Sequence, residues 1–435
     1  MTKMSFFNGL KEIGGTFVAI ETDKAVCMFD FGFAVQKNVD GKIFRRKKSF
    51  AADYIRLGML TPFDGIYDEK TAKKTGLKAY GQTDKKTFFV ISHMHIDHMG
   101  GLGSLAKEVP VYMSEDSLKL YNRLAENDDI QDAFHENCIG IPYGEKFSVE
   151  DITVEVIQID HDVIGACGFL ISTPDGKVCY TGDYRFHGYH PENTREFANK
   201  CKGADYLITE GVSLSFDDVD ILSLEEPEKD DKTEYGLLNK MTELSQSEKG
   251  LIVINPYNRN VERIHNLINT LAKSGRKLVL DKVAADYVYS FYPEDEIYVY
   301  APTSKRLKDY DNFKLVHRKE IKENPEKYCL QLDYQNQFEL LDLKKIVSLY
   351  VHMDGAPLGD YDPSFAKMLG FLEMLKIPYS NIGLSGHAKP YYIRWMIDTI
   401  SPKALIPLHS FRPEQVNSKN IGKRILPEYG DSITF

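Results

Sequence analysis

The sequence predicts a mixed α/β protein, on three observations. Short apolar runs typical of buried strands recur along the chain, among them 88–91, 152–160 and 404–408. Several of these runs stop at a histidine, aspartate or glutamate, and strand ends are where side chains converge on a site in layered α/β structures. After residue 211, helical and strand patterns alternate, which indicates a parallel sheet.

The composition is that of a globular protein. Of the 435 residues, 43% are apolar and 27% are charged. There is no long apolar run and no apolar leader at the N-terminus, so we expect a cytoplasmic protein without a membrane span. The six cysteines form no Cys-x-x-Cys pair, which argues against a disulfide framework and a cysteine-based zinc site.

The formal net charge of −10 neither favours nor excludes a polyanionic substrate, because the charge around a site matters more than the total. Nucleic-acid-binding proteins usually carry a local basic excess. The clearest basic run here is 45–48, which we interpret as a solvated loop. The acidic run 216–231 is interpreted as an exposed loop or linker.

The N-terminal elements can be placed in order. Two strands within 16–31 are joined by a hairpin turn at 22–24. Residues 40–87 are polar and rich in lysine, and we expect an inserted loop that contains a small amount of regular structure. The strand 88–91 follows, and a helix begins after Ser114, a suitable N-cap.

Four further strands precede residue 211. One is expected at 152–160, two form the hairpin 167–183 that turns at Asp175-Gly176, and one is expected at 206–209. Beyond 211 we expect a separate lobe built on a small parallel sheet. Near the C-terminus, Pro390 is suited to the first turn of a helix. The apolar stripe of that helix consists of Ile393, Met396, Ile397 and Ile400.

Three histidines and an aspartate fall within six residues: His93, His95, Asp97 and His98. No packing rule requires these residue types at this spacing, whereas imidazole nitrogen and carboxylate oxygen suit zinc. Alternate residues of an extended segment point to one side, so His93 and His95 can share one ion, and Asp97 and His98 can reach a second. Asp183 could bridge two ions about 3.5–4 Å apart.

Other polar side chains stand where strands stop. These candidates are His161, Asp183, Glu210 and His409. The remaining histidines outside the two C-terminal motifs are interpreted as surface or packing residues: His135, His187, His190, His265, His317 and His352.

The His-x-His-x-Asp-His motif after a strand resembles the signature of the metallo-β-lactamase fold. Asp30, in "FDFG", resembles the early aspartate of that fold. His161 resembles its third metal-binding motif, and Asp183, in "YTGDYRF", its bridging aspartate.

The rest of the chain resembles the β-CASP group within that fold. Glu210 in "LITEG", His387 in "LSGHA" and His409 in "IPLHS" resemble its motifs A, B and C. The stretch 161–186 resembles the matching part of ribonuclease J enzymes, and the motif B and C residues resemble those of RNA-processing members. Two residues depart from ribonuclease J: Asp162 replaces the usual serine after His161, and Ser410 replaces the usual glycine after His409.

The resemblance implies a metallo-β-lactamase αββα sandwich with an inserted β-CASP α/β cap domain. The core would comprise 1–210 and 381–435, and the cap 211–380. It also implies two Zn²⁺ ions, with Mn²⁺ as an alternative. One ion would be bound by His93, His95 and His161, the other by Asp97, His98 and His409, with Asp183 bridging.

The resemblance also implies the remaining roles. Asp97, Asp183 and His387 would be catalytic, with His387 stabilising or protonating groups around the phosphate. Residues Ser385, Gly386, His387 and Ala388 would bind substrate. Asp30 and Glu210 would lie behind the ligands, holding histidines or the junction with the cap.

The expected function is that of a zinc-dependent hydrolase, a ribonuclease that cleaves RNA phosphodiester bonds with hydroxide activated by two metals. The sequence leaves open three alternatives: a hydrolase of a small ester, thioester or nucleotide, a DNA nuclease, and a non-catalytic partner subunit. The expected partner is an RNA substrate rather than a membrane, and both a monomer and a homo-oligomer are left open.

Overall fold

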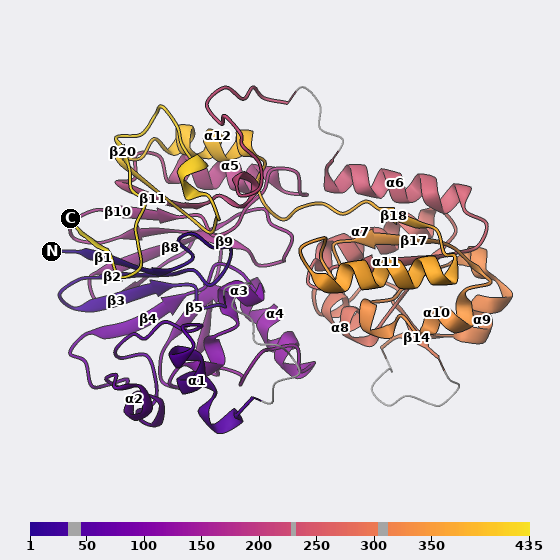
Figure 1. Cartoon of the computed structure of the whole chain (residues 1–435), viewed down its shortest axis with the longest axis horizontal. Helices are drawn as coiled ribbons and strands as arrows, with labels where there is room; N and C mark the ends of the chain where they lie inside the picture. The colour runs from indigo at the N-terminus through magenta and orange to yellow at the C-terminus, as the bar shows by residue number, and fades with distance from the viewer. Residues whose placement is uncertain (34–44, 228–231, 303–311) are drawn as a thin grey trace. The chain divides into compact units, whose positions relative to one another are not determined.

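The computed structural model describes residues 1–33, 45–227, 232–302 and 312–435, and the chain divides into two compact units. The first unit comprises 1–228 and 386–435, and the second comprises 229–385. In Figure 1 the second unit runs from pink to orange. Residues 211–227, which we assigned to the cap, thus lie in the first unit.

The first unit contains two seven-stranded sheets. In order, the strands of one sheet are β21 (Ser432–Thr434), β1 (Lys3–Asn8), β2 (Phe17–Glu21), β3 (Ala25–Phe29), β4 (Lys86–Val90), β5 (Val111–Ser114) and β6 (Cys138–Ile141). Those of the other are β20 (Lys423–Arg424), β19 (Ala404–Leu408), β11 (Tyr206–Glu210), β10 (Lys177–Tyr180), β9 (Cys167–Ser172), β8 (Ile152–Gln158) and β7 (Lys146–Val149). The predicted hairpins β2–β3 and β9–β10 are both antiparallel pairs.

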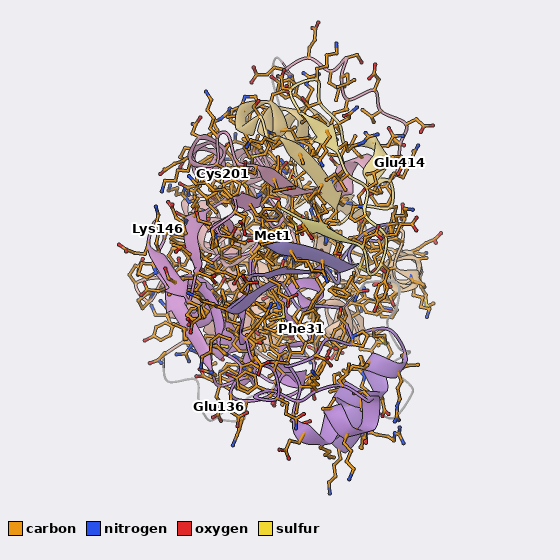
Figure 2. The ribbon with its side chains drawn as sticks, turned by 90° about the vertical axis from the view of Figure 1, so that its left-hand side faces the viewer. Met1, Phe31, Glu136, Lys146, Cys201 and Glu414 are labelled. Carbon is orange, nitrogen blue, oxygen red and sulfur yellow. The ribbon has the colours of Figure 1, made fainter. Side chains whose placement is uncertain are left out.

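The two sheets pack face to face over one apolar core. Buried residues of the first sheet, such as Val18 and Phe88, share this core with residues of the second, such as Phe169 and Ile208. Helices cover the outer faces: α4 (Glu115–Glu126) contacts β5 and β6, whereas α5 (Pro191–Lys200) and α12 (Pro390–Ile400) contact β8 and β11. The first unit is therefore the predicted αββα sandwich. Lys146, on the edge strand β7, lies at the margin of the view in Figure 2.

The local predictions for two helices are confirmed. Ser114 caps α4 by accepting a hydrogen bond from the Ser117 N–H at 3.0 Å. The four buried residues of α12 are the predicted stripe, and Pro390 stands at its start.

The segment 45–87 contains the small amount of regular structure that we predicted, and residues 40–44 lie outside the described residues. It contains α1 (Phe50–Arg56) and α2 (Glu69–Thr75). Asp68 caps α2 by accepting a hydrogen bond from the Thr71 N–H, and Gly76 ends the helix in the left-handed conformation. Both helices are short and carry few apolar residues, so their periodicity is weak in the sequence.

The second unit is built on one seven-stranded sheet in which every strand pair is parallel. In order, its strands are β15 (Lys314–His317), β14 (Tyr298–Ala301), β13 (Lys277–Leu280), β16 (Tyr328–Gln331), β12 (Leu251–Pro256), β17 (Val347–Met353) and β18 (Tyr379–Asn381). Its helices are α6 (Glu234–Ser247), α7 (Val261–Lys273), α8 (Lys282–Phe291), α9 (Arg318–Glu323), α10 (Glu339–Leu343) and α11 (Pro363–Leu375). Buried side chains of α9, α10 and α11 pack with the sheet in one apolar cluster.

Two wider expectations can be compared with the described residues. None of the helices in these ranges is both long and apolar enough to cross a membrane. All six cysteines are free.

Candidate metal centre

The His-x-His-x-Asp-His motif begins at His93, shortly after the end of β4, and extends into a four-residue helix, α3 (Ile96–Met99). The segment after β3 fixes its backbone: the N–H of Phe31, labelled in Figure 2, donates to the His98 carbonyl at 2.7 Å. Gly32 allows this close approach, because a Cβ there would lie 1.9 Å from the Asp97 carbonyl carbon. A residue larger than glycine would therefore displace the motif.

Seven of the predicted site residues converge with His387 into overlapping clusters. Within each cluster the potential ligand atoms lie within 4.8 Å of one another. The clusters are His93, His95, His161 and Asp183; Asp97, His98 and His409; and Asp183, His387 and His409. Asp183 belongs to two of them, the first and the third. None of the six histidines that we assigned to the surface or to packing belongs to a cluster among the described residues.

The donor atoms face one another without partners of their own. The buried Nε2 atoms of His93, His98 and His409 make no hydrogen bond among the described residues. They lie 3.8, 3.2 and 3.4 Å from Oδ2 of Asp183. Buried polar atoms are nearly always paired. A set of imidazole nitrogens and carboxylate oxygens around a common centre fits divalent cations such as Zn²⁺ or Mn²⁺.

The opposite ring nitrogens of three histidines are held by protein groups. Nδ1 of His98 lies 2.7 Å from Oδ2 of Asp30, and Nδ1 of His161 lies 2.6 Å from the Gly386 carbonyl oxygen. Nδ1 of His93 lies 2.9 Å from the Ser92 hydroxyl. Such contacts orient metal-binding imidazoles and place the proton on the nitrogen away from the ion.

Asp30 gathers donors from three elements. One oxygen accepts the Ser92 N–H at 2.8 Å. The other accepts the Ser92 hydroxyl, His98 Nδ1 and the hydroxyl of Tyr180. Asp30 also has a φ of 57°, a strained conformation for a residue other than glycine. The carboxylate is thus fixed by its surroundings behind the ligands, where the sequence predicts it.

His409 is held differently. Its φ is 51°, and its Nδ1 accepts a hydrogen bond from the Gly14 N–H at 3.1 Å. This leaves the ring proton on Nε2, which faces Asp183. Binding a cation through Nε2 therefore requires that proton to leave or to move to Nδ1, where the Thr16 hydroxyl, 3.4 Å away, can accept it.

Burial and neighbouring charges set the protonation of these groups. Burial lowers the pKa of both His161 and His409 to about 3, so both are neutral imidazoles. Burial also lowers the pKa of His93. Burial opposes the ionisation of Asp183, but the imidazoles of His409 and His98 outweigh it and hold the pKa of Asp183 well below its usual range. Burial opposes protonation of His98, but Asp183, Asp97 and Asp30 outweigh burial and raise its pKa, so a cation bound there would displace a proton from His98.

His387 lies at the rim of the cluster. Its Nδ1 is 3.1 Å from Oε2 of Glu210 and 3.7 Å from Oδ2 of Asp183. Burial opposes its protonation, but Glu210 and Asp183 outweigh burial and raise the pKa of His387 to about 10. His387 is therefore a cation near neutral pH, unlike His161 and His409.

The structure separates the predicted substrate-binding residues. Gly386 and Ala388 are buried beside the centre, and the Ala388 N–H donates to Oε1 of Glu210 at 3.4 Å. Ser385 is exposed and belongs to the second unit.

Sequence reasoning missed four supporting residues: Gly14, Thr16, Ser92 and Tyr180. Gly14, Thr16 and Ser92 contact a histidine of the clusters, and Tyr180 contacts Asp30. Of these four residues, only Ser92 could have been suspected from the sequence, because it is next to His93.

Comparisons with known proteins agree with this geometry. Residues 70–227 match the family model of the beta-lactamase superfamily domain. A crystal structure of a protein of unknown function from Enterococcus faecalis V583 is 29% identical and has a TM-score of 0.83, with 99% of each chain covered.

Several relatives are named ribonuclease J. The one from Mycoplasma genitalium is 21% identical, covering 97% of this chain and 70% of its own. The one from Helicobacter pylori J99 is 22% identical, covering 94% of this chain and 55% of its own. The one from Pyrococcus abyssi is 23% identical, covering 64% of this chain and 58% of its own. The matched region thus represents between half and three-quarters of each of these relatives. This chain therefore has the metallo-β-lactamase fold and is similar to ribonuclease J over most of its length.

Proposed function

We propose that this chain is a metal-dependent ribonuclease that hydrolyses phosphodiester bonds of RNA. The convergence of ligand atoms from separate strand ends on Asp183 is the observation that carries this proposal. Relatives named ribonuclease J, which match up to 97% of the chain, support the choice of RNA as substrate.

Two divalent cations, Zn²⁺ or Mn²⁺, fit the proposed ligand set. His93, His95 and His161 would bind one, and Asp97, His98 and His409 the other, with Asp183 shared. Cations bound there would lower the pKa of water to about 7 and offset the negative charge of the phosphate.

The chain's own groups supply the remaining chemistry. His387, which is protonated beside Glu210, would place a positive charge and a proton near the reacting phosphate. Glu210 would keep His387 in place, since its carboxylate also accepts the N–H groups of Tyr184 and Val212. A group with a raised pKa can give its proton to a leaving oxygen and regain it between turnovers.

The test is cleavage of one labelled RNA bearing a 5′-phosphate or a 5′-hydroxyl, beside a DNA of the same sequence and a small phosphodiester. We expect metal-dependent cleavage of RNA, lost in the Asp183→Asn variant and retained in His190→Ala. His190 is a suitable control because it contacts Glu192 rather than the cluster. Preferred cleavage of DNA or of the small phosphodiester would support one of the other hydrolases instead. No turnover with metal present would refute the proposal.

A further inference from the structure

Asp162, which replaces the serine usual in ribonuclease J, points into the candidate metal centre. Its Oδ1 lies 3.3 Å from Nε2 of His161 and 3.3 Å from Nε2 of His95. Its side chain is only 12% exposed, and Oδ1 makes no hydrogen bond among the described residues. A buried carboxylate oxygen without a hydrogen bond is rare and costly.

The contact with His161 brings two acceptors together. Because Nδ1 of His161 faces the Gly386 carbonyl oxygen, which can only accept, the ring proton lies on Nδ1. Nε2 of His161 then presents a lone pair to the carboxylate oxygen of Asp162, and this nitrogen also lies 3.3 Å from Nδ1 of His95. Two acceptors at this distance repel one another unless a cation lies between them.

Gly386 makes room for the carboxylate. A Cβ at Gly386 would lie 2.7 Å from both Cγ and Oδ1 of Asp162. The backbone of Gly386 is in a region open to other residues, since it has no positive φ. Glycine is therefore needed at position 386 because a larger residue would collide with the Asp162 side chain.

We propose that the Asp162 carboxylate is a further ligand of the ion bound by His93, His95, His161 and Asp183. This inference rests on the proposed metal site and extends it. An additional oxygen donor gives this position a larger share of hard ligands than three imidazoles and one carboxylate do. Hard ligands favour Mn²⁺ relative to Zn²⁺, so Asp162 adjusts the metal preference of the centre.

The test measures metal binding directly, on protein from which metal has been removed by chelation. Affinities for Zn²⁺ and Mn²⁺ are measured by calorimetry or chelator competition for the wild type, Asp162→Ser and Asp162→Asn. The affinity for Mn²⁺ should fall at least about 10-fold in both variants, and the affinity for Zn²⁺ should fall less. Glu155→Gln is the matched control, because Glu155 lies on β8, is also 12% exposed and pairs with Lys146.

Two further measurements separate ligation from a positioning role. The visible absorption of bound Co²⁺ becomes stronger as its coordination number falls, so it should increase in Asp162→Ser. Gly386→Ala should weaken Mn²⁺ binding by displacing Asp162. Adding Gly386→Ala to Asp162→Ser should weaken binding no further, a non-additivity expected only if both changes act through one contact.

Failure of this inference can be distinguished from failure of the proposed function. If the wild-type protein binds no metal, the proposed function itself is wrong. If the wild type binds metal and Asp162→Ser keeps both affinities, the inference is wrong. An equal fall for Zn²⁺ and Mn²⁺ with an unchanged Co²⁺ spectrum also overturns it, because Asp162 would then only position His95.

Discussion

Oδ2 of Asp30 lies 2.7 Å from Nδ1 of His98, and both side chains are completely buried. This contact places the ring proton of His98 on Nδ1 and directs the lone pair of Nε2 toward Asp183, 3.2 Å away. Asp30 thus orients a histidine of the candidate metal centre, although it belongs to none of the clusters itself.

Asp30→Asn should weaken metal binding by about 10–100-fold, the effect typical of losing such a supporting carboxylate. One oxygen of Asp30 accepts the Ser92 N–H, and the other accepts three donors. An asparagine must therefore turn its NH₂ group toward a donor on one side or the other. Asparagine tolerates the φ of 57°, so the substitution should not strain the backbone at this position.

Metal affinity of the Asp30→Asn protein can be measured by chelator competition. Asp205→Asn is a suitable control, because Asp205 pairs with Lys403 before the start of β11, at the opposite end of that strand from Glu210. Wild-type affinity in Asp30→Asn would show that the charge of Asp30 is not needed.

Acid should destabilise the metal-free protein. His161 and His409 have folded-state pKa values of about 3, whereas both would titrate near their ordinary value of about 6.5 in the unfolded chain. Between these values the unfolded chain binds more protons, so the free energy of unfolding falls as the pH falls. The stabilisation is complete above about pH 6.5 and is lost progressively toward pH 3.

This pH dependence can be measured by urea unfolding of chelator-treated protein. A His161→Gln, His409→Gln double variant should lose less stability on acidification from about pH 7 to pH 5 than the wild type does. His387 acts with the opposite sign: its raised pKa stabilises the fold below about pH 6.5, and that contribution is lost as the pH rises through about 10. An equal acid response of wild type and double variant would contradict the assignment.

The sequence predicted which polar side chains cluster together better than it predicted the residues that contact them. Metal-binding side chains carry a signal because their types and spacing serve no packing need, and strand ends bring them together. His93, His161 and His409 could therefore be assigned to one centre before any contact was known. Apolar periodicity was equally informative for α12, whose buried face is the predicted one.

Contacts made by single polar atoms could not be predicted. Gly14 and Thr16 lie far from His409 in the chain, and no residue pattern marks a backbone N–H that donates to an imidazole. In the sequence, Asp162 stands out only as a departure from ribonuclease J. Its proximity to His95 and His161 depends on the course of the chain after β8, which sequence alone does not reveal.

The second unit is stabilised by a buried ion pair. Arg263, completely buried, donates to both oxygens of Glu234 at 2.9 and 2.8 Å and to Asp354 at 2.8 Å. Glu234→Gln removes one charge and should cost about 3–5 kcal/mol, because the guanidinium stays buried without its main counterion. Lys240→Ala, an exposed change in the same helix, should stay within about 0.5 kcal/mol.

Two spectroscopic signals can distinguish destabilisation of the second unit from destabilisation of the first. Circular dichroism reports unfolding of both units, whereas the fluorescence of Trp395, the single tryptophan, reports the first. Glu234→Gln should lower the urea midpoint seen by circular dichroism and leave the Trp395 midpoint in place. An unchanged circular dichroism midpoint would show that the ion pair contributes little.

His409 and His387 should respond differently to substitution, although both follow apolar segments near the C-terminus. Nε2 of His409 faces Asp183 and Asp97 at 3.4 and 3.7 Å and makes no hydrogen bond among the described residues. His409→Ala should therefore reduce the metal content from two ions per chain toward one and abolish RNA cleavage. Metal analysis by mass spectrometry checks this prediction, and a full complement of metal in His409→Ala would contradict it.

His387→Ala should keep both ions and still lose RNA cleavage. Its Nδ1 lies 3.1 Å from Oε2 of Glu210 and 3.7 Å from Oδ2 of Asp183, so its nearest partner is a carboxylate outside the proposed ligand set. Losing a proton donor or a charge stabiliser should lower single-turnover cleavage about 10²–10⁴-fold. Substrate binding should weaken less, because the interaction is strongest as charge develops in the transition state. Loss of an ion, or cleavage at the wild-type rate, would show that His387 does not have this role.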